Sequence, residues 1–315
     1  MVSYLQVQNL TRHVGDRTLF SNLSFGIGQG HKVGLIARNG TGKTTLLNIL
    51  AGTDQADGGN VVYHNGIRVG YLPQQPIYPQ ELTVIEACFW HGNDTTNFIR
   101  EYEQCMATEG HPGLEVILDR MEREGAWDYE ARSKAILSKL NISDFKQPLS
   151  QLSGGQLKRV ALANVLITEP DFLILDEPTN HLDLQMIEWL EEYLSRGTLT
   201  LLMVTHDRYF LDRVCNYILE LDEETVYTYM GNYAYFLEKR EERLDVARAE
   251  VAKANNLYRT ELDWMRRMPQ ARAHKAQYRI DNFYEIEKKA KQQHQEADIK
   301  LSVKSGYIGN KIFEA

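Results

Sequence analysis

The chain has 315 residues, of which 43% are hydrophobic and 25% are charged, and its formal net charge is −8. This length is enough for one domain with a sizeable core and an appended element. No run approaches the ~20 apolar residues of a membrane-spanning helix, and the N-terminus lacks a secretory signal pattern. The three cysteines are scattered and have no CxxC spacing, which favours a reducing compartment. We therefore expect a cytoplasmic protein with no membrane segment.

The N-terminal part predicts a phosphate-binding loop. Residues 9–27 and 61–71 read as strands of an antiparallel sheet, and 32–36 as a short buried strand that a glycine-rich segment and a helix follow. In this context, called a Walker A motif or P-loop, backbone N–H groups wrap the β- and γ-phosphates of a nucleotide. Ala37 occupies a position where the general pattern has glycine. We expect ATP to be bound by Asn39, Gly40, Thr41, Gly42, Lys43, Thr44 and Thr45.

Two of these side chains have roles of their own. The Lys43 ammonium is expected to reach the β- and γ-phosphate oxygens, and the Thr44 hydroxyl is expected to bind Mg²⁺.

Residues 77–168 are predicted to form a helical subdomain. Helical composition is found at 97–106 and 127–140, with a turn at 109–113 between them. The pentapeptide Leu152-Ser153-Gly154-Gly155-Gln156 then opens a helix that should end near Ile167.

Two apolar runs further on end in polar side chains. Residues 172–175 deliver Asp176 and Glu177 to the carboxyl end of a buried strand, which is where open α/β sheets bind ligands. Residues 199–204 form a similar run before His206, and strands within 217–229 close the domain.

The C-terminal part is more basic and has helical periodicity. Residues 1–237 carry 18 Lys and Arg against 30 Asp and Glu, a net charge of −12, whereas 238–304 carry 16 against 12, a net charge of +4. A seven-residue repeat predicts a helix with one narrow apolar seam, formed by Leu237, Leu244, Val251, Tyr258 and Met265. Because Pro269 interrupts the repeat and helical spacing resumes at Phe283, we expect a hairpin of two antiparallel helices.

Five cations lie around the predicted turn, with no acid among them. Such a cluster beside an acidic domain favours contact with a nucleic-acid phosphate backbone. The residues are Arg266, Arg267, Arg272, Lys275 and Arg279.

The order of these motifs resembles that of the ABC-F family of ATP-binding cassette ATPases. The pentapeptide is similar to the ABC signature and Asp176-Glu177 to the end of a Walker B strand, while the predicted turn resembles the linker of the Uup type. The resemblance implies an α/β fold, a P-loop ABC-type nucleotide-binding domain with antiparallel β and α-helical subdomains, followed by an α-helical hairpin. It assigns 1–236 to the cassette, 237–305 to a basic linker and 306–315 to the start of a truncated second cassette, as in an N-terminal fragment of a longer protein.

The family's catalytic roles carry over to matching positions. Asp176 is expected to hold Mg²⁺, mainly through water, and Glu177 to act as the general base, while His206 contacts the γ-phosphate. Gln74 matches the Q-loop glutamine that touches Mg²⁺ and the attacking water, although the adjacent Gln75 fits as well. The family stacks adenine on an aromatic ring where this chain has Val14, so base selectivity is expected to be loose.

The signature acts on a partner. In the family, the positions of Ser153, Gly154, Gly155 and Gln156 cap ATP that another cassette holds. Hydrolysis therefore needs either a missing C-terminal cassette or a head-to-tail homodimer, and the fragment alone is expected to be inactive or weak unless it dimerises.

The leading functional prediction is an ATP hydrolase that couples ATP binding and hydrolysis to ribosome or RNA engagement through the linker hairpin, with the ribosome and transfer RNA as partners. One alternative is an ATP-gated DNA-binding module in replication or repair. Another is the ATPase subunit of a membrane transporter, which the fused basic hairpin disfavours.

Overall fold

The computed structural model describes most of the chain, and the chain divides into two compact units, Met1–Phe236 and Leu237–Ala315. Within the part that is described, no helix is both long enough and apolar enough to cross a bilayer. The described residues are 2–88, 90, 101, 102, 105, 106, 108, 113–123, 126–197, 199–222, 225–266, 283–285 and 287.

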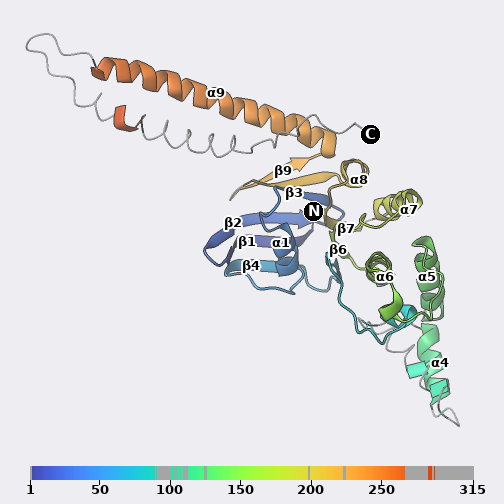
Figure 1. Ribbon diagram of the computed structural model, residues 1–315. Coiled ribbons are helices and arrows are strands. Elements are labelled where there is room, and N and C mark those ends of the chain that lie inside the picture. Colours follow the sequence, from blue (N-terminus) through green and yellow to red (C-terminus); the bar gives the residue numbers. More distant parts are fainter. Residues whose placement is uncertain are drawn as a thin grey trace, which may run out of the picture. The chain divides into compact units, whose positions relative to one another are not determined.

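A six-stranded sheet forms the centre of the first unit (Figure 1). Its first five strands are parallel, and the sixth, β9 (Thr225–Met230), pairs antiparallel with its neighbour at one edge. Every residue of the second and third strands of the sheet is buried, which explains their continuous apolar sequences. The parallel strands in spatial order are β5 (Val69–Leu72), β6 (Phe172–Asp176), β7 (Thr200–Val204), β3 (Lys32–Ala37) and β8 (Tyr217–Asp222).

The second sheet is antiparallel, with the order β2-β1-β4. Its strands are β1 (Ser3–Val14), β2 (Arg17–Gly28) and β4 (Gly58–Tyr63). The prediction that 61–71 belongs wholly to this sheet was wrong, because a turn at His64–Gly66 separates β4 from β5 and the latter pairs parallel with β6. The apolar tetrapeptide of β5 is too short for its alternation to show which sheet it joins.

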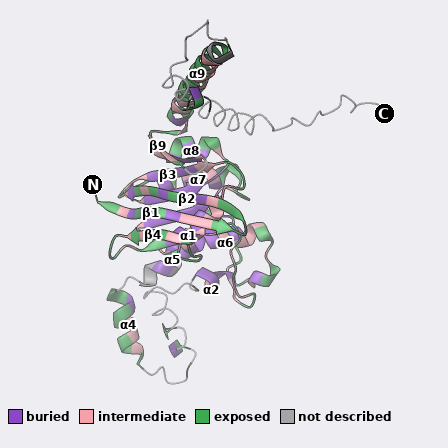
Figure 2. Ribbon diagram, turned by 90° about the vertical axis from the view of Figure 1, so that its left-hand side faces the viewer, coloured by how far each residue is buried: buried purple, intermediate pink, exposed green. Residues whose placement is uncertain are grey.

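The two faces of the central sheet bury different cores. Phe172 and Ile174 of β6 pack with the antiparallel sheet and with α1 (Lys43–Leu50), whereas Leu173 and Leu175 pack with helices on the opposite face. This split follows from the alternation of side chains along a strand. Figure 2 shows the buried residues concentrated in these layers and α4 largely exposed.

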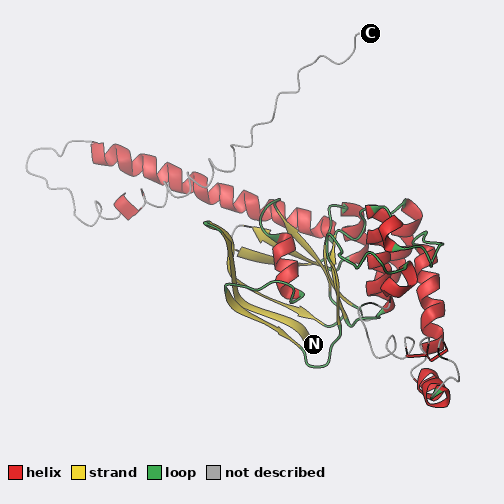
Figure 3. Cartoon of the chain, turned by 60° about the horizontal axis from the view of Figure 1, so that its bottom comes forward, coloured by secondary structure: helices red, strands yellow, loops and turns green. Residues whose placement is uncertain are grey.

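The helices of the first unit that cover the second face are gathered on one side of the strands (Figure 3). The helix predicted at 127–140 is confirmed, whereas most of 97–106 lies outside the described residues. The remaining helices are α2 (Val84–Cys88), α4 (Leu114–Arg123), α5 (Ala126–Lys139), the 3₁₀ turn η1 (Leu149–Gln151), α6 (Gly154–Ile167), α7 (Leu184–Ser195) and α8 (Arg208–Val214).

The long helix α9 (Tyr233–Arg266) begins in the first unit and continues through the second. Leu244, Val251 and Tyr258 of the predicted seam are half-buried, but Leu237 is exposed. The Tyr258 ring stacks on that of Phe283 with centroids 5.7 Å apart, so residues from both sides of the predicted turn meet within the second unit. The turn itself and residues 306–315 lie outside the described residues.

Candidate nucleotide-binding site

The phosphate-binding loop joins β3 to α1 as predicted. Gly40 and Gly42 have φ angles of +78° and +90°, a left-handed conformation that glycine adopts without strain. The Lys43 ammonium donates hydrogen bonds to the carbonyl oxygens of Ala37 and Arg38, at 3.0 and 3.2 Å, and to Oδ1 of Asn39, at 3.3 Å. The loop thus places its lysine and the first turn of a helix together, an arrangement that favours anions.

Asp176 lies at the carboxyl end of β6 and is 1% exposed. The Thr44 side chain hydrogen-bonds to it, so the structure brings together two of the predicted metal ligands. Within the described residues, Oδ2 of Asp176 makes no hydrogen bond. Burial raises the pKa of this carboxyl, although the Thr44 hydrogen bond and the charges of Lys158 and Lys43 oppose the shift.

The Lys43 ammonium interacts electrostatically with the same acidic pair. Burial lowers the pKa of its ammonium, while the negative charges of Glu177 and Asp176 act in the opposite direction. The loop and the acidic pair therefore share one electrostatic site, although β7 separates their strands in the sheet.

Glu177 is held beside His206 by the ends of two strands. Its φ angle is +53°, which is uncommon for a residue with a side chain, and its N–H donates to the carbonyl oxygen of Val204 at 2.8 Å. The backbone N–H of His206 donates to Oε2 of Glu177 at 3.3 Å, and the ring Nε2 lies 3.5 Å from Oε1. The Glu177 side chain is 7% exposed and that of His206 is 72% exposed, so the pair has a buried carboxylate and an accessible ring.

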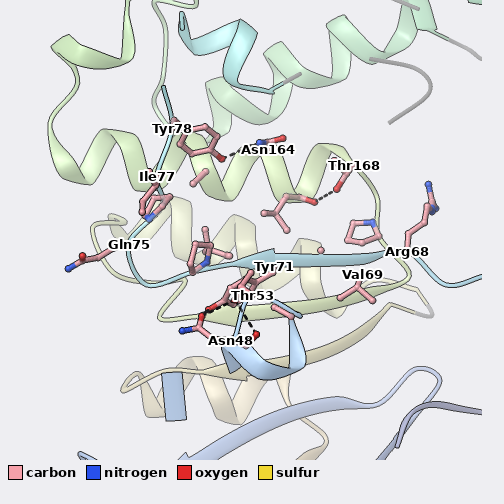
Figure 4. Close-up of a pocket in the computed structure, with 18 residues that line it drawn as sticks. Asn48, Thr53, Arg68, Val69, Tyr71, Gln75, Ile77, Tyr78, Asn164 and Thr168 are labelled. Atoms are coloured by element: carbon pink, nitrogen blue, oxygen red, sulfur yellow. Dashed lines mark hydrogen bonds between the residues drawn. The ribbon is translucent and has the colours of Figure 1, made fainter. Parts of the chain in front are cut away.

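Gln74 and Gln75 both follow β5 and are both exposed. Gln75 lines a cavity of about 700 Å³ that runs along β5 between α1 and α6 (Figure 4). In its walls, the Tyr71 hydroxyl donates to Oδ1 of Asn48, at 2.6 Å, and Nδ2 of Asn164 donates to the Tyr78 hydroxyl, at 3.1 Å. Tyr71 and Tyr78, which lie on either side of the two glutamines in the sequence, are therefore hydrogen-bonded to α1 and to α6.

The signature residues form the start of α6. Ser153 is the N-cap: its hydroxyl accepts a hydrogen bond from the N–H of Gln156 at 3.2 Å, and Oε1 of Gln156 accepts one from the N–H of Ser153 at 2.9 Å. This capping box gives Gln156 a structural role that its Ser-x-x-Gln spacing already predicts. Gly155 faces His181, because a Cβ atom added there would lie 3.2 Å from the His181 Cβ.

Lys158 was missed by the sequence reasoning. It is 6% exposed, burial lowers the pKa of its ammonium, and the charges of Asp176 and Glu177 oppose that shift. The only sequence signal is a cation within an otherwise apolar helix that follows the signature.

The five linker cations were predicted as contacts with nucleic acid, but their side chains lie outside the described part.

The residues present suit Mg²⁺ bound together with a nucleotide. Among the described residues, no group of three or more His, Cys, Asp and Glu side chains is arranged to hold a metal on its own. Mg²⁺ is commonly held by one or two protein ligands and by substrate phosphates. The unpaired oxygen of Asp176 beside the Thr44 hydroxyl fits that requirement.

A phosphate-binding loop and an acidic pair at the carboxyl ends of strands in one parallel sheet are the organisation of a P-loop ATPase. The added antiparallel sheet and the helical region that ends in a capped α6 are those of an ATP-binding cassette. A family model described as ABC transporter matches residues 20–180, and a second with the same description matches 219–301. The chain therefore belongs to the ABC transporter family of ATP-binding cassette ATPases.

Several curated proteins are similar to this chain. An uncharacterized ABC transporter ATP-binding protein, YfmR of Bacillus subtilis, is 41% identical over 100% of this chain and 51% of its own length. The energy-dependent translational throttle protein EttA of Mycobacterium tuberculosis is 35% identical over 93% of this chain and 55% of its own. EttA of Escherichia coli K12 is 31% identical over 95% and 55%. The chain thus spans about half the length of these relatives.

Solved structures confirm the fold class. The ATP-binding subunit of an ABC transporter superposes with a TM-score of 0.56 and 20% identity, covering 72% of this chain and 90% of that one. A nucleotide-free ATP-binding cassette from an ABC transporter gives 0.52 and 20% identity, covering 73% and 92%.

Proposed function

We propose that this chain is the cassette and linker of an ABC-F ATPase of the Uup type, which couples ATP binding and hydrolysis to ribosome or RNA engagement in the cytoplasm. The observation that carries the proposal is the alignment with proteins named as energy-dependent translational throttles, which extends over 93–95% of this chain. An alignment of that length includes the linker as well as the cassette.

In this proposal, ATP is the substrate and Mg²⁺ supplies charge neutralisation at its phosphates. The loop amides and Lys43 bind the phosphates, while Thr44, Asp176 and Gln74 hold the metal ion. Glu177 accepts the proton of the attacking water, and its buried carboxylate is kept in place by the N–H of His206. The exposed His206 ring is available to the γ-phosphate.

The signature face needs a partner cassette. Gly154 and Gly155, which follow the N-cap Ser153, place their N–H groups in the first turn of α6, which suits a phosphate held by another surface. Each cassette therefore contributes one half of two sites. A second cassette in the same protein or a second copy of this chain would complete them.

The proposal is tested by co-sedimentation with ribosomes. A protein that carries this chain with Glu177→Gln, together with a second cassette, is sedimented with purified ribosomes with and without ATP, across a salt series. We expect retention that requires ATP, because blocked hydrolysis preserves the ATP-bound pairing of the two cassettes. Retention should be lost when Arg266, Arg267 and Arg272 are changed to Gln.

A matched triple change on α9 controls for bulk charge. Arg248, Lys253 and Arg259 are exposed, and changing them to Gln removes the same charge without touching the predicted turn. Equal losses from both triples would contradict a specific role for the turn. If nucleotide binds but never promotes retention, competition between structured RNA and branched DNA at one salt concentration would test the DNA-binding alternative.

A further inference from the structure

Strand β2 forms one wall of the phosphate-binding loop. A Cβ atom added to Gly42 would lie 3.1 Å from Leu19, and one added to Gly40 would lie 3.8 and 3.9 Å from the two terminal guanidinium nitrogens of Arg17. Arg17 and Leu19 are two residues apart and so lie on one face of the strand. Leu19 packs against the loop, and Arg17 places a cation beside it.

The charge of Arg17 is not neutralised within the described residues. Arg12, on the neighbouring strand, contrasts with it because its guanidinium pairs with Asp54 and Asp57 at 3.1 and 3.2 Å. Arg17 is exposed and forms no ion pair with any residue that the structure describes. An unpaired guanidinium next to a loop that wraps anions has no evident structural purpose.

We propose that Arg17 binds the polyphosphate chain of the nucleotide directly. The inference rests on the proposed binding of ATP by the loop. A guanidinium presents two parallel N–H donors to phosphate oxygens. Both terminal nitrogens of Arg17 are at nearly the same distance, 3.8 and 3.9 Å, from the position that a Cβ atom on Gly40 would take. Arg17 thus supplies a second cation to the phosphates, in addition to Lys43.

The ligand class follows from the neighbours of Arg17. Its cross-strand partner is Val14, which is 56% exposed, and the turn between them is Gly15-Asp16. None of these side chains offers an aromatic ring to a base. Affinity that comes from phosphate contacts at this hairpin is therefore shared by nucleoside triphosphates with different bases.

The test measures the affinity of the 315-residue chain for ATP, GTP and inorganic tripolyphosphate by calorimetry, with Mg²⁺ present. Arg17→Gln should weaken binding of all three by about tenfold, the scale of one charge-assisted hydrogen-bonding contact. Arg17→Lys should recover part of the loss, since it keeps the charge but not the paired donors. Arg196→Gln is the matched control, because it removes an exposed arginine from the end of α7.

Three results would overturn the proposal. Unchanged affinity in Arg17→Gln would show that the guanidinium does not contact the ligand. A loss for ATP and GTP without a loss for tripolyphosphate would place Arg17 on the base or sugar, and an equal loss in Arg196→Gln would reduce the effect to net charge. A parent chain that binds none of the three ligands would instead refute the nucleotide-binding function itself. Thermal denaturation of each variant checks that the fold is retained.

Discussion

At the level of single residues, the burial of Asp176, a proposed Mg²⁺ ligand, carries an energetic cost. It is 1% exposed, and burial raises its pKa because the charged form loses solvation. We expect Asp176→Asn to raise the free energy of unfolding at pH 7, because the neutral amide avoids the desolvation cost of the buried carboxylate. The same change should abolish ATP hydrolysis, since an amide is a poor Mg²⁺ ligand. Urea denaturation and phosphate release measure the two effects.

The stabilising effect of Asp176→Asn should depend on pH. An aspartate with a raised folded pKa ionises first in the unfolded chain, so the parent loses stability as pH rises between the unfolded and folded pKa values. The advantage of the variant should be complete above the raised pKa and should vanish below the ordinary value. Asp263→Asn, at an exposed position of α9, is the control. A gain that stayed constant as the pH fell would contradict the electrostatic origin.

Glu177→Gln and Lys43→Ala should separate hydrolysis from binding. Glutamine retains an oxygen for the N–H of His206 but cannot accept a proton from water, so turnover should fall by at least about 100-fold while ATP still binds. Lys43→Ala should weaken nucleotide binding, because it removes a cation from the loop. Both are measured as affinity and turnover in a protein with two cassettes. Parental turnover in Glu177→Gln would show that the base is another residue.

At the level of elements, the two glycines that open α6 differ in their surroundings. A Cβ atom on Gly155 would lie 3.2 and 3.3 Å from the Cβ and Cγ atoms of His181, whereas nothing lies within 4 Å of one on Gly154. We expect Gly155→Ala to cost about 1 kcal/mol through displacement of His181. Gly154→Ala should be neutral or slightly stabilising, because alanine favours a helix. Urea titrations compare the two, and equal stabilities would exclude the His181 contact as the cause.

The elements also show what the sequence can and cannot predict. The buried run at 172–175 was placed correctly, and the loop predicted at 37–45 was placed at the right point but drawn too long, since β3 ends at Ala37 and α1 begins at Lys43. Strand length, glycine spacing and following polar residues are local signals. β5 was assigned to the wrong sheet, since its pairing with β6 joins segments about a hundred residues apart. The proximity of Arg17 to Gly40 and of Lys158 to Asp176 has the same origin: both depend on packing between elements.

At the level of the whole molecule, charge imposes opposite salt dependences on the two proposed associations. Residues 1–237 carry a net charge of −12, so two cassettes repel one another and salt should strengthen their association. Residues 238–304 carry +4, so contact with RNA should weaken as salt is added. A single salt series therefore distinguishes pairing of cassettes from binding of nucleic acid.

The last prediction tests whether copies of this chain complete each other's sites. Lys43→Ala damages the phosphate-binding loop and leaves the signature intact, whereas Gly154→Ala alters the signature and leaves the loop intact. In a head-to-tail pair of the two variants, one composite site combines the intact loop of one copy with the intact signature of the other. We expect each variant alone to be nearly inactive and their mixture to regain ATP hydrolysis that rises with protein concentration. Because neither chain has a complete site in isolation, a mixture no more active than its components would mean that two copies do not form the composite site, and that hydrolysis needs a different second cassette.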